Sequence, residues 1–462
     1  MNISPQRFRG PLTYDEAIAG EVCELSNLAS ALSERVERAR SVFQEPIDLL
    51  NSDLKRAIWP RDAEAALEKC VARLRHRWLN VSSSSVNQSF RTPTAPKLIK
   101  TSTGQLISSG YERELQPVAL ETRCRSFFGS PPEGWTADHV VLSSGQAAMN
   151  AALHLVQSLD PRREGASLSF AHVGAYFETT ELLDLFSSCI KVTARGWDAI
   201  DRGLADGPHC LVIEPVFFED GFKKIELKDL IRKLGHAADK LRAVIFDDTL
   251  CGAPQHSGQD LRELTDLLLP VIRVNSGLKL FQGGFELANV GILTVYSPVS
   301  ARLQASDIGA GVRKIRSLIG SGPTMAETAA LEAPWFLSRP HTDRFQANVF
   351  ANNALLASAL AGKTKSFASI AHPTVDCGSG VSPFCVLTLK KSSGRTYENI
   401  EQTIGAEARL LDVLFEQGGS FGFRGHRYEV VRPEGKTPFL RVAVGSRVGW
   451  SLEGIIQLLR LI

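Results

Sequence analysis

Residues 140–159 read VVLSSGQAAMNAALHLVQSL, an apolar run that passes through a Ser-Ser-Gly turn into a helical pattern. The run predicts a buried strand, and the apolar residues after the turn recur at the three- and four-residue spacing of a helix. A strand that leads through a short turn into a helix is the repeating unit of a parallel sheet covered by helices. This stretch therefore favours an α/β fold.

The same alternation of strand and helix patterns continues to about residue 296. The strand patterns are CLVIEPVFF (210–218), AVIFDD (243–248), LPVIRVNS (269–276) and VGILTVY (290–296), and the helix pattern IELKDLIRKLGHAADKL covers 225–241. Strands that alternate with helices predict a three-layer αβα sandwich around a mostly parallel sheet. We assign this large α/β domain to residues 115–300.

Helical patterns are prominent on both sides of this domain. Residues 1–114 are predicted to form a helical N-terminal extension and an arm, with a Ser-, Thr- and Pro-rich loop at 81–97. Residues 301–462 are predicted to form a smaller C-terminal α+β domain. Its patterns are a long helix at 340–362, strands at 382–391 and 439–445, and a final helix at 452–462.

The composition of the 462-residue chain excludes several classes of protein. Its 52 basic and 50 acidic residues give a net charge of +2, without a concentrated basic stripe, so nucleic acid is not an expected partner. The eight cysteines show no CxxC spacing, which argues against zinc and favours a reducing compartment. No apolar stretch approaches the roughly 20 residues of a membrane span, and no signal peptide opens the sequence. We expect a cytoplasmic protein that does not contact membranes.

Ligands of open parallel sheets bind at the carboxyl ends of the strands, so the residues that follow each predicted strand are candidates for a site. The turn Ser143–Gln146 opens a helix and offers backbone N–H groups to a phosphate, although a plain N-cap has the same sequence. Asp247 follows a strand either as a ligand or as a capping residue of a turn. Lys279 is either a solvated charge or a reactive amine, and its apolar neighbours and the glycines that follow favour the amine.

A phosphate seat, a carboxylate and a lysine at three strand ends together suit pyridoxal 5′-phosphate (PLP). Lys279 would form the Schiff base with the aldehyde, Asp247 would keep the pyridine nitrogen protonated, and the helix end would bind the phosphate. The cofactor is thus predicted from the combination, because each feature alone has an ordinary structural interpretation.

The motifs at these positions resemble those of the cystathionine γ-synthase/methionine γ-lyase family, fold-type I PLP enzymes of Cys/Met metabolism. SSGQAAM (143–149) is similar to the family's SSGMAAI, AYFETT (175–180) is placed like its YGGT segment, and FDDTLCGAP (246–254) resembles its VDNT stretch. NSGLK (275–279) resembles SATK. The resemblance implies that Ser144, Gly145, Gln146, Thr249 and Ser276 bind the cofactor together with Asp247 and Lys279, and that Tyr176 stacks on its ring.

Two further matches concern the substrate and a second subunit. Tyr111 and Arg113 have the spacing of the family's YSR segment, which implies contact with the phosphate, and for Tyr111 with the substrate, of a neighbouring subunit. FLRVAVG (439–445) is similar to LRLSVG, which implies that Arg441 binds the α-carboxylate of an amino acid. We therefore expect a homodimer or homotetramer with shared active sites. His172, Arg424 and His426 could either lie near the site or have structural roles.

The departures from the family's motifs suggest an unusual substrate. Leu278 replaces a threonine, Phe285 stands in place of the histidine of a GGH segment, and the N-terminal segment is longer than the family's arm. We predict elimination or replacement at the γ or β carbon of an amino acid, with Lys279, Tyr176 and Asp247 as catalytic residues. The leaving group could be an ester, a thioether or a sulfonium.

Two alternatives remain at the level of sequence. An aminotransferase or another fold-type I activity would use the same lysine, aspartate, arginine and phosphate turn. A catalytically inactive protein could keep the fold and use its N-terminal helices as a docking surface. The intact Lys279, Asp247 and Arg441 favour an enzyme.

Overall fold

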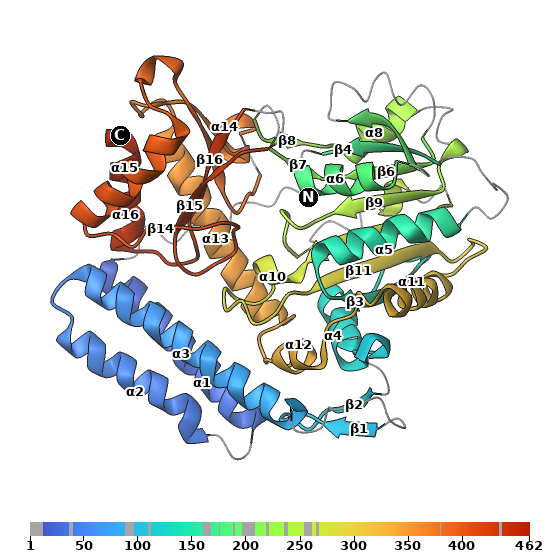
Figure 1. The fold of residues 1–462 in the computed structure, drawn as a ribbon, viewed down its shortest axis with the longest axis horizontal. Coiled ribbons are helices and arrows are strands. Elements are labelled where there is room, and N and C mark those ends of the chain that lie inside the picture. The colour runs from blue at the N-terminus through green and yellow to red at the C-terminus, as the bar shows by residue number, and fades with distance from the viewer. Residues whose placement is uncertain are drawn as a thin grey trace.

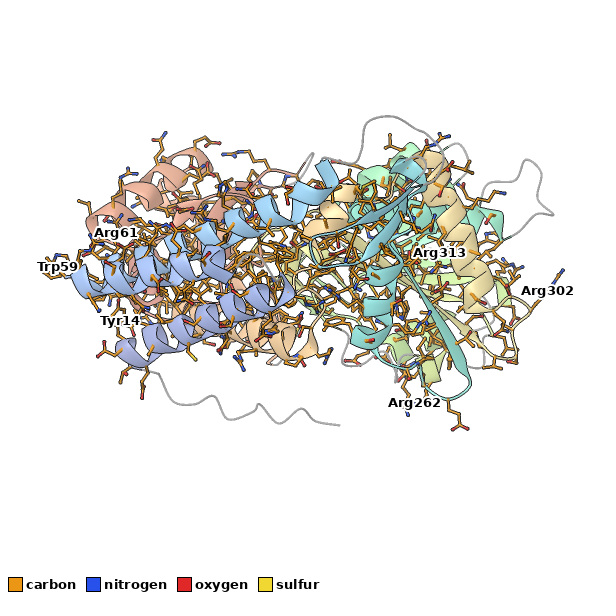
Figure 2. The ribbon with its side chains drawn as sticks, turned by 90° about the horizontal axis from the view of Figure 1, so that it is seen from below. Tyr14, Trp59, Arg61, Arg262, Arg302 and Arg313 are labelled. Carbon is orange, nitrogen blue, oxygen red and sulfur yellow. The ribbon has the colours of Figure 1, made fainter. Side chains whose placement is uncertain are left out.

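The computed structural model shows a central sheet, a second sheet near the C-terminus and a bundle of N-terminal helices, which in Figure 1 lies below the C-terminal sheet. Its description covers residues 13–36, 40–87, 97–109, 112–159, 168–174, 176–187, 190–195, 208–218, 221–234, 239–253, 261–264, 268–378, 380–433 and 437–462. Tyr14, Trp59 and Arg61 lie at one end of the elongated molecule, and Arg262, Arg302 and Arg313 lie at the other (Figure 2).

The central sheet has seven strands, and six of them are parallel. In spatial order they are β3 (Trp135–Leu142), β11 (Gly291–Pro298), β10 (Val271–Ser276), β9 (Ala243–Asp247), β6 (Cys210–Ile213), β4 (Leu168–Val173) and β5 (Ile190–Arg195). Only β11 runs antiparallel to its neighbours β3 and β10. The carboxyl ends of the parallel strands therefore meet at one edge, which is where the candidate site residues follow them.

Helices cover both faces of this sheet. On one face α5 (Gly145–Ser158) packs against β10, where Ile272 and Val274 belong to the core, and α11 (Ala305–Ile319) packs against β3 and β11. On the other face α8 (Leu227–Leu234) packs against Val271, while α4 (Val118–Phe128) packs against Val141. Alternate residues of one strand thus point into two separate cores. The predicted αβα sandwich with a mostly parallel sheet is confirmed.

Three long helices form the N-terminal bundle, which is blue in Figure 1: α1 (Tyr14–Arg35), α2 (Arg40–Arg56) and α3 (Pro60–Asn87). Its core contains Leu25, Phe43, Leu67 and Trp78, and it continues into Phe285 and Trp335 of the body of the protein. The bundle is therefore packed against the segment that follows Lys279. A two-stranded hairpin, β1 (Lys97–Lys100) and β2 (Leu106–Ser109), and the short helix η1 (Glu112–Glu114) lead on to α4.

The prediction of a loop from residue 81 is wrong for residues 81–87, which extend α3. The serine hydroxyls in this turn donate to backbone carbonyls of the preceding turn: Ser82 to Leu79 at 3.2 Å and Ser84 to Val81 at 2.8 Å. Val86 is buried in a small core beneath the β1–β2 hairpin. Tertiary burial and these local hydrogen bonds thus override the low helix propensity of a serine run.

The C-terminal part is an α+β layer, as the sequence predicted. Its sheet has the order β12 (Phe367–Ala371), β13 (Cys385–Leu389), β16 (Phe439–Ala443), β15 (Arg427–Val431) and β14 (Glu416–Gln417). Its helices are α13 (Arg339–Leu360), α15 (Tyr397–Leu410) and α16 (Trp450–Leu461), with the short α12 (Met325–Ala330), α14 (Pro373–Asp376) and η5 (Lys391–Ser393). Apolar residues of α13, α15 and α16 pack on one face of the sheet. The domain boundaries drawn from sequence stay predictions.

Among the residues that the structure describes, no helix combines the length and the apolar character needed to cross a membrane.

Candidate active site

The turn between β3 and α5 has the geometry of a capped helix start. Ser144 is the N-cap, and its hydroxyl accepts a hydrogen bond from the amide of Ala147 at 3.0 Å. The remaining amides of a first helical turn have no acceptor within the helix, so they can bind an anion. Gly145 lies against Ser276, since a Cβ added to it would be 3.0 Å from the Cβ of Ser276. Ser143 to Ala147, Gln146 included, are partly exposed.

Two hydrogen bonds organise the neighbouring ends of β9 and β10. The amide of Thr249 donates to a carboxylate oxygen of Asp247 at 3.0 Å, and the amide of Ser276 donates to the Thr249 hydroxyl at 3.0 Å. Since Ser276 also contacts Gly145, the ends of β3, β9 and β10 form one connected edge. The structure thus brings together the predicted residues Ser144, Gly145, Asp247, Thr249 and Ser276.

Asp247 is held in surroundings that oppose its charge. Burial and the nearby carboxylate of Glu214 raise its pKa to about 6. The charge of the next residue, Asp248, is instead stabilised, because its carboxylate pairs with Arg273 at 2.7 Å in the protein interior. Asp247 therefore lacks the strong cationic neighbour that Asp248 has, and a cationic ligand group beside Asp247 would stabilise its ionised form.

Asp247→Asn is expected to stabilise the cofactor-free protein at neutral pH. Folding raises the pKa of this carboxyl from about 4 to about 6. The carboxyl therefore contributes most to the free energy of unfolding below pH 4, and this contribution is lost as the pH rises through 6. The variant should gain about 2–3 kcal/mol at pH 7 and less than about 1 kcal/mol at pH 4. Urea denaturation at both pH values measures the two gains in the free energy of unfolding.

Asp248→Asn is the matched control and should destabilise the protein, because it breaks the pair with Arg273. If Asp247→Asn changed the free energy of unfolding equally at pH 4 and pH 7, the raised pKa of Asp247 would be wrong.

Lys279 lies on the short helix α10 (Gly277–Leu280), directly after β10. Its amine donates to the hydroxyl of Ser420 and lies 5.5 Å from the centroid of the Phe421 ring. Burial and the positive charge of Arg441 lower the pKa of the Lys279 amine. Lys279 is thus a partly buried, hydrogen-bonded amine and not a freely solvated surface lysine, and its role as a reactive amine stays a prediction.

A loop of the C-terminal part, residues 418–422, contacts Lys279. Ser420 has the left-handed backbone conformation (φ 76°), and a Cβ added to Gly422 would be 1.8 Å from the carbonyl oxygen of Lys279. Only a glycine fits at position 422. Sequence reasoning missed Ser420. The sequence around Ser420 (GGSFG, 418–422) contains nothing that connects it with a lysine 141 residues earlier.

Tyr176 begins α6 (Phe177–Leu185) and is fixed through its backbone. Its amide donates to both carboxylate oxygens of Glu214, at 3.0 and 3.3 Å, and the ring of His172 lies 3.0 Å from the same carboxylate. His172 is buried, which favours its structural role. Burial and a hydrogen bond to Glu178 raise the pKa of the Tyr176 hydroxyl above its ordinary value. Tyr176 therefore keeps its proton at neutral pH in the cofactor-free protein.

Arg441 lies on β16, opposite Glu429 of β15. Its Nε donates to a carboxylate oxygen of Glu429 at 2.6 Å, and its Nη2 contacts the same oxygen. That oxygen also accepts from the amide of Ser420 at 3.1 Å. Glu429, which the sequence did not single out, thus orients Arg441 and connects it to the loop that holds Lys279.

Three further candidates, Arg113, Arg424 and His426, lie outside this group. Arg113 is exposed on η1, and Tyr111 is outside the described residues. Arg424 is buried and donates to Glu24 of α1 at 2.6 Å and to the carbonyl of Gly283 at 2.9 Å. His426 is buried beneath the C-terminal sheet and accepts from the amide of Gly445. These contacts give Arg424 and His426 structural roles.

The donor set fits PLP, although no cofactor is present in the structure. Backbone amides and hydroxyls form an anion seat at the end of β3, a carboxylate lies at the end of β9, and a desolvated amine follows β10. Tyr176 lies within electrostatic reach of both Asp247 and Arg441. Each chemical feature of the cofactor therefore has a residue of the right type at this edge.

No family model and no curated protein matches the chain, but solved structures match its fold. A methionine γ-lyase from Micromonospora echinospora in its apo form has a TM-score of 0.54 at 19% identity, covering 77% of this chain and 88% of that one. A cystathionine γ-lyase from yeast has a TM-score of 0.56 at 15% identity, covering 82% and 92%. An SPT solved with PLP has a TM-score of 0.51 at 12% identity, covering 83% of each chain. The predicted fold-type I architecture is confirmed.

Proposed function

We propose that this chain is a PLP-dependent enzyme of the cystathionine γ-synthase/methionine γ-lyase type, which eliminates or replaces a group at the γ or β carbon of an amino acid. The observation that carries the proposal is the amine of Lys279, desolvated between Ser420 and Phe421 and adjoining an edge lined by a phosphate turn and Asp247. The names of the lyases with the same fold support it.

The residues that would hold the cofactor come from the strand ends. The amides after Ser144, together with the hydroxyls of Ser276 and Thr249, would bind the phosphate. Asp247 would pair with the pyridine nitrogen, and Tyr176 would cover the ring. When bound, PLP supplies an electron-accepting ring that stabilises negative charge at the α carbon of the amino acid.

Three residues of the chain would bind the substrate and transfer its protons. Arg441, oriented by Glu429, binds the α-carboxylate of the substrate. Lys279 removes the α-proton, because its lowered pKa leaves more of the amine neutral. Tyr176, which lies within electrostatic reach of Asp247 and Arg441, is the candidate proton donor to the leaving group.

The test is to reconstitute the protein with PLP, reduce it with borohydride and map the modified peptide by mass spectrometry. We expect a phosphopyridoxyl group on Lys279 and protection of the site by excess inorganic phosphate. No incorporation, or incorporation at exposed lysines only, would refute the cofactor assignment. Ammonia release from an amino acid without an added 2-oxo acid supports elimination, whereas a strict requirement for the 2-oxo acid would make the protein an aminotransferase.

A further inference from the structure

An apolar wall adjoins both Lys279 and Arg441. We define it by six residues from the strand ends of the large sheet and from the C-terminal part: Val216, Phe218, Leu250, Phe384, Phe421 and Phe439. The Lys279 amine lies 5.5 Å from the centroid of the Phe421 ring, and the Arg441 guanidinium lies 5.5 Å from that of Phe384. One end of the wall therefore lies beside Lys279 and Arg441.

The rings of the wall contact one another in a continuous row. The centroid distances are 5.4 Å from Phe384 to Phe421, 5.6 Å from Phe218 to Phe384 and 5.6 Å from Phe218 to Phe439. Phe384 and Phe421 are buried, whereas Phe218 and Phe439 are only partly buried. The inner rings thus support two outer rings that keep part of their apolar surface accessible.

A hairpin that follows β6 supplies part of this surface. It comprises β7 (Val216–Phe217) and β8 (Lys223–Lys224), and it reaches from the large sheet towards the C-terminal strands (Figure 1). The amide of Phe222 donates to Asp376 at 2.9 Å, which fixes the hairpin to the C-terminal part. The hairpin begins directly after Glu214, the residue that holds Tyr176. The same chain segment therefore connects the Tyr176 side of the site with the wall.

Two carboxylates close to the wall, Asp376 and Glu429, are engaged in hydrogen bonds with other groups. Asp376 accepts from the amides of Phe222 and His372, and Glu429 accepts from Arg441 and Ser420. None of the six wall residues has a polar side chain. The wall thus has no hydrogen-bonding side chain of its own for a polar substituent, and a charged group placed against it would lose hydration without compensation.

We propose that the wall binds the substituent at the β or γ carbon of the substrate, and that it selects amino acids in which this substituent is bulky and apolar. Phe218 and Phe439 are the specificity-determining residues. The inference rests on the proposed function, because it places the α carbon between Lys279 and Arg441. It narrows the substrate class to amino acids whose leaving group carries an alkyl or aryl group, as a thioether or an ester can.

The test compares L-leucine with L-asparagine, which have side chains of nearly equal shape but opposite polarity. Their dissociation constants are measured by calorimetric titration of the PLP-loaded protein. L-Leucine should bind about tenfold or more tightly than L-asparagine, as expected for transfer of its side chain to an apolar surface. Phe218→Ser should reduce this ratio to about threefold or less, and Phe218→Leu should preserve it. Phe186→Ser removes a half-buried ring on the α5 side of the sheet and should leave the ratio unchanged.

Three results would overturn the inference while leaving the proposed function intact: equal affinities in the wild-type protein, a ratio that Phe218→Ser does not change, or tighter binding of L-lysine than of L-leucine. Borohydride labelling of Lys279 in the same preparation keeps the two proposals apart. Absence of labelling would refute the proposed function and this inference with it.

Discussion

Lys279→Ala is expected to slow exchange of the α-proton of L-leucine by at least about a hundredfold in the PLP-loaded protein. A positioned general base contributes on the order of 10²–10⁴ to a proton transfer, and Lys279 is the desolvated amine at this site. The measurement is loss of the Cα–H signal of L-leucine in D₂O by NMR. Proton exchange is a useful readout because it needs no knowledge of the leaving group.

The controls separate loss of the base from loss of the site. Lys314→Ala removes an exposed lysine on α11 and should leave the exchange rate unchanged. Lys279→Arg keeps a positive charge beside Phe421, but its guanidinium stays protonated, so it should be as slow as the alanine variant. An exchange rate near that of the wild-type protein in Lys279→Ala would remove this residue from the mechanism.

The sequence predicted those parts of the fold and site that can be recognised within one short segment of the chain. Strand runs and helix periodicity identified the αβα sandwich, because each pattern lies within one element. Ser144, Asp247 and Lys279 could be picked out because each lies at or shortly after the end of a strand, and parallel strands end at the same edge. The structure connects Gly145, Thr249 and Ser276 at that edge by contacts that the strand order implies but the residue types do not.

The parts that were missed depend on pairs of segments far apart in the chain. Ser420 contacts Lys279 across 141 residues, and Glu429 matters because it lies opposite Arg441 in a sheet register that no single segment reveals. The hairpin after Glu214 looked like a continuation of a strand, since Val216 and Phe217 are typical strand residues. Tertiary pairing, which sequence patterns do not encode locally, decided each of these cases.

The N-terminal bundle also had no function that the sequence could indicate, and its contacts give it a physical role. Arg424 donates both to Glu24 of α1 and to the carbonyl of Gly283, four residues after Lys279. The aromatic face of Phe285 lies 5.1 Å from the same guanidinium. The bundle therefore supports the segment that follows the reactive lysine, so its detachment is expected to disturb the site as well as the fold.

Arg447→Met is expected to lower the stability of the bundle's attachment by about 3–5 kcal/mol, the usual cost of removing one partner from a buried ion pair. Arg447 is 2% exposed and pairs with both carboxylate oxygens of Glu21, at 3.0 and 3.1 Å, and with Glu68 at 2.9 Å. Burial alone would raise the pKa of Glu21, but Arg447 brings it below the ordinary value. Without the arginine, the Glu21 carboxylate would be left nearly buried and without its bidentate partner.

Hydrogen exchange of the α1 amides measures this loss, because it reports local opening of the bundle separately from unfolding of the large sheet. Arg232→Met, which removes an exposed pair with Asp229, is the matched control and should change exchange by less than about 0.5 kcal/mol. The double variant Arg447→Met with Glu21→Gln should recover part of the loss, since it removes the unpaired charge as well. Unchanged α1 protection in Arg447→Met would show that the apolar contacts of Phe285 and Trp335 hold the bundle on their own.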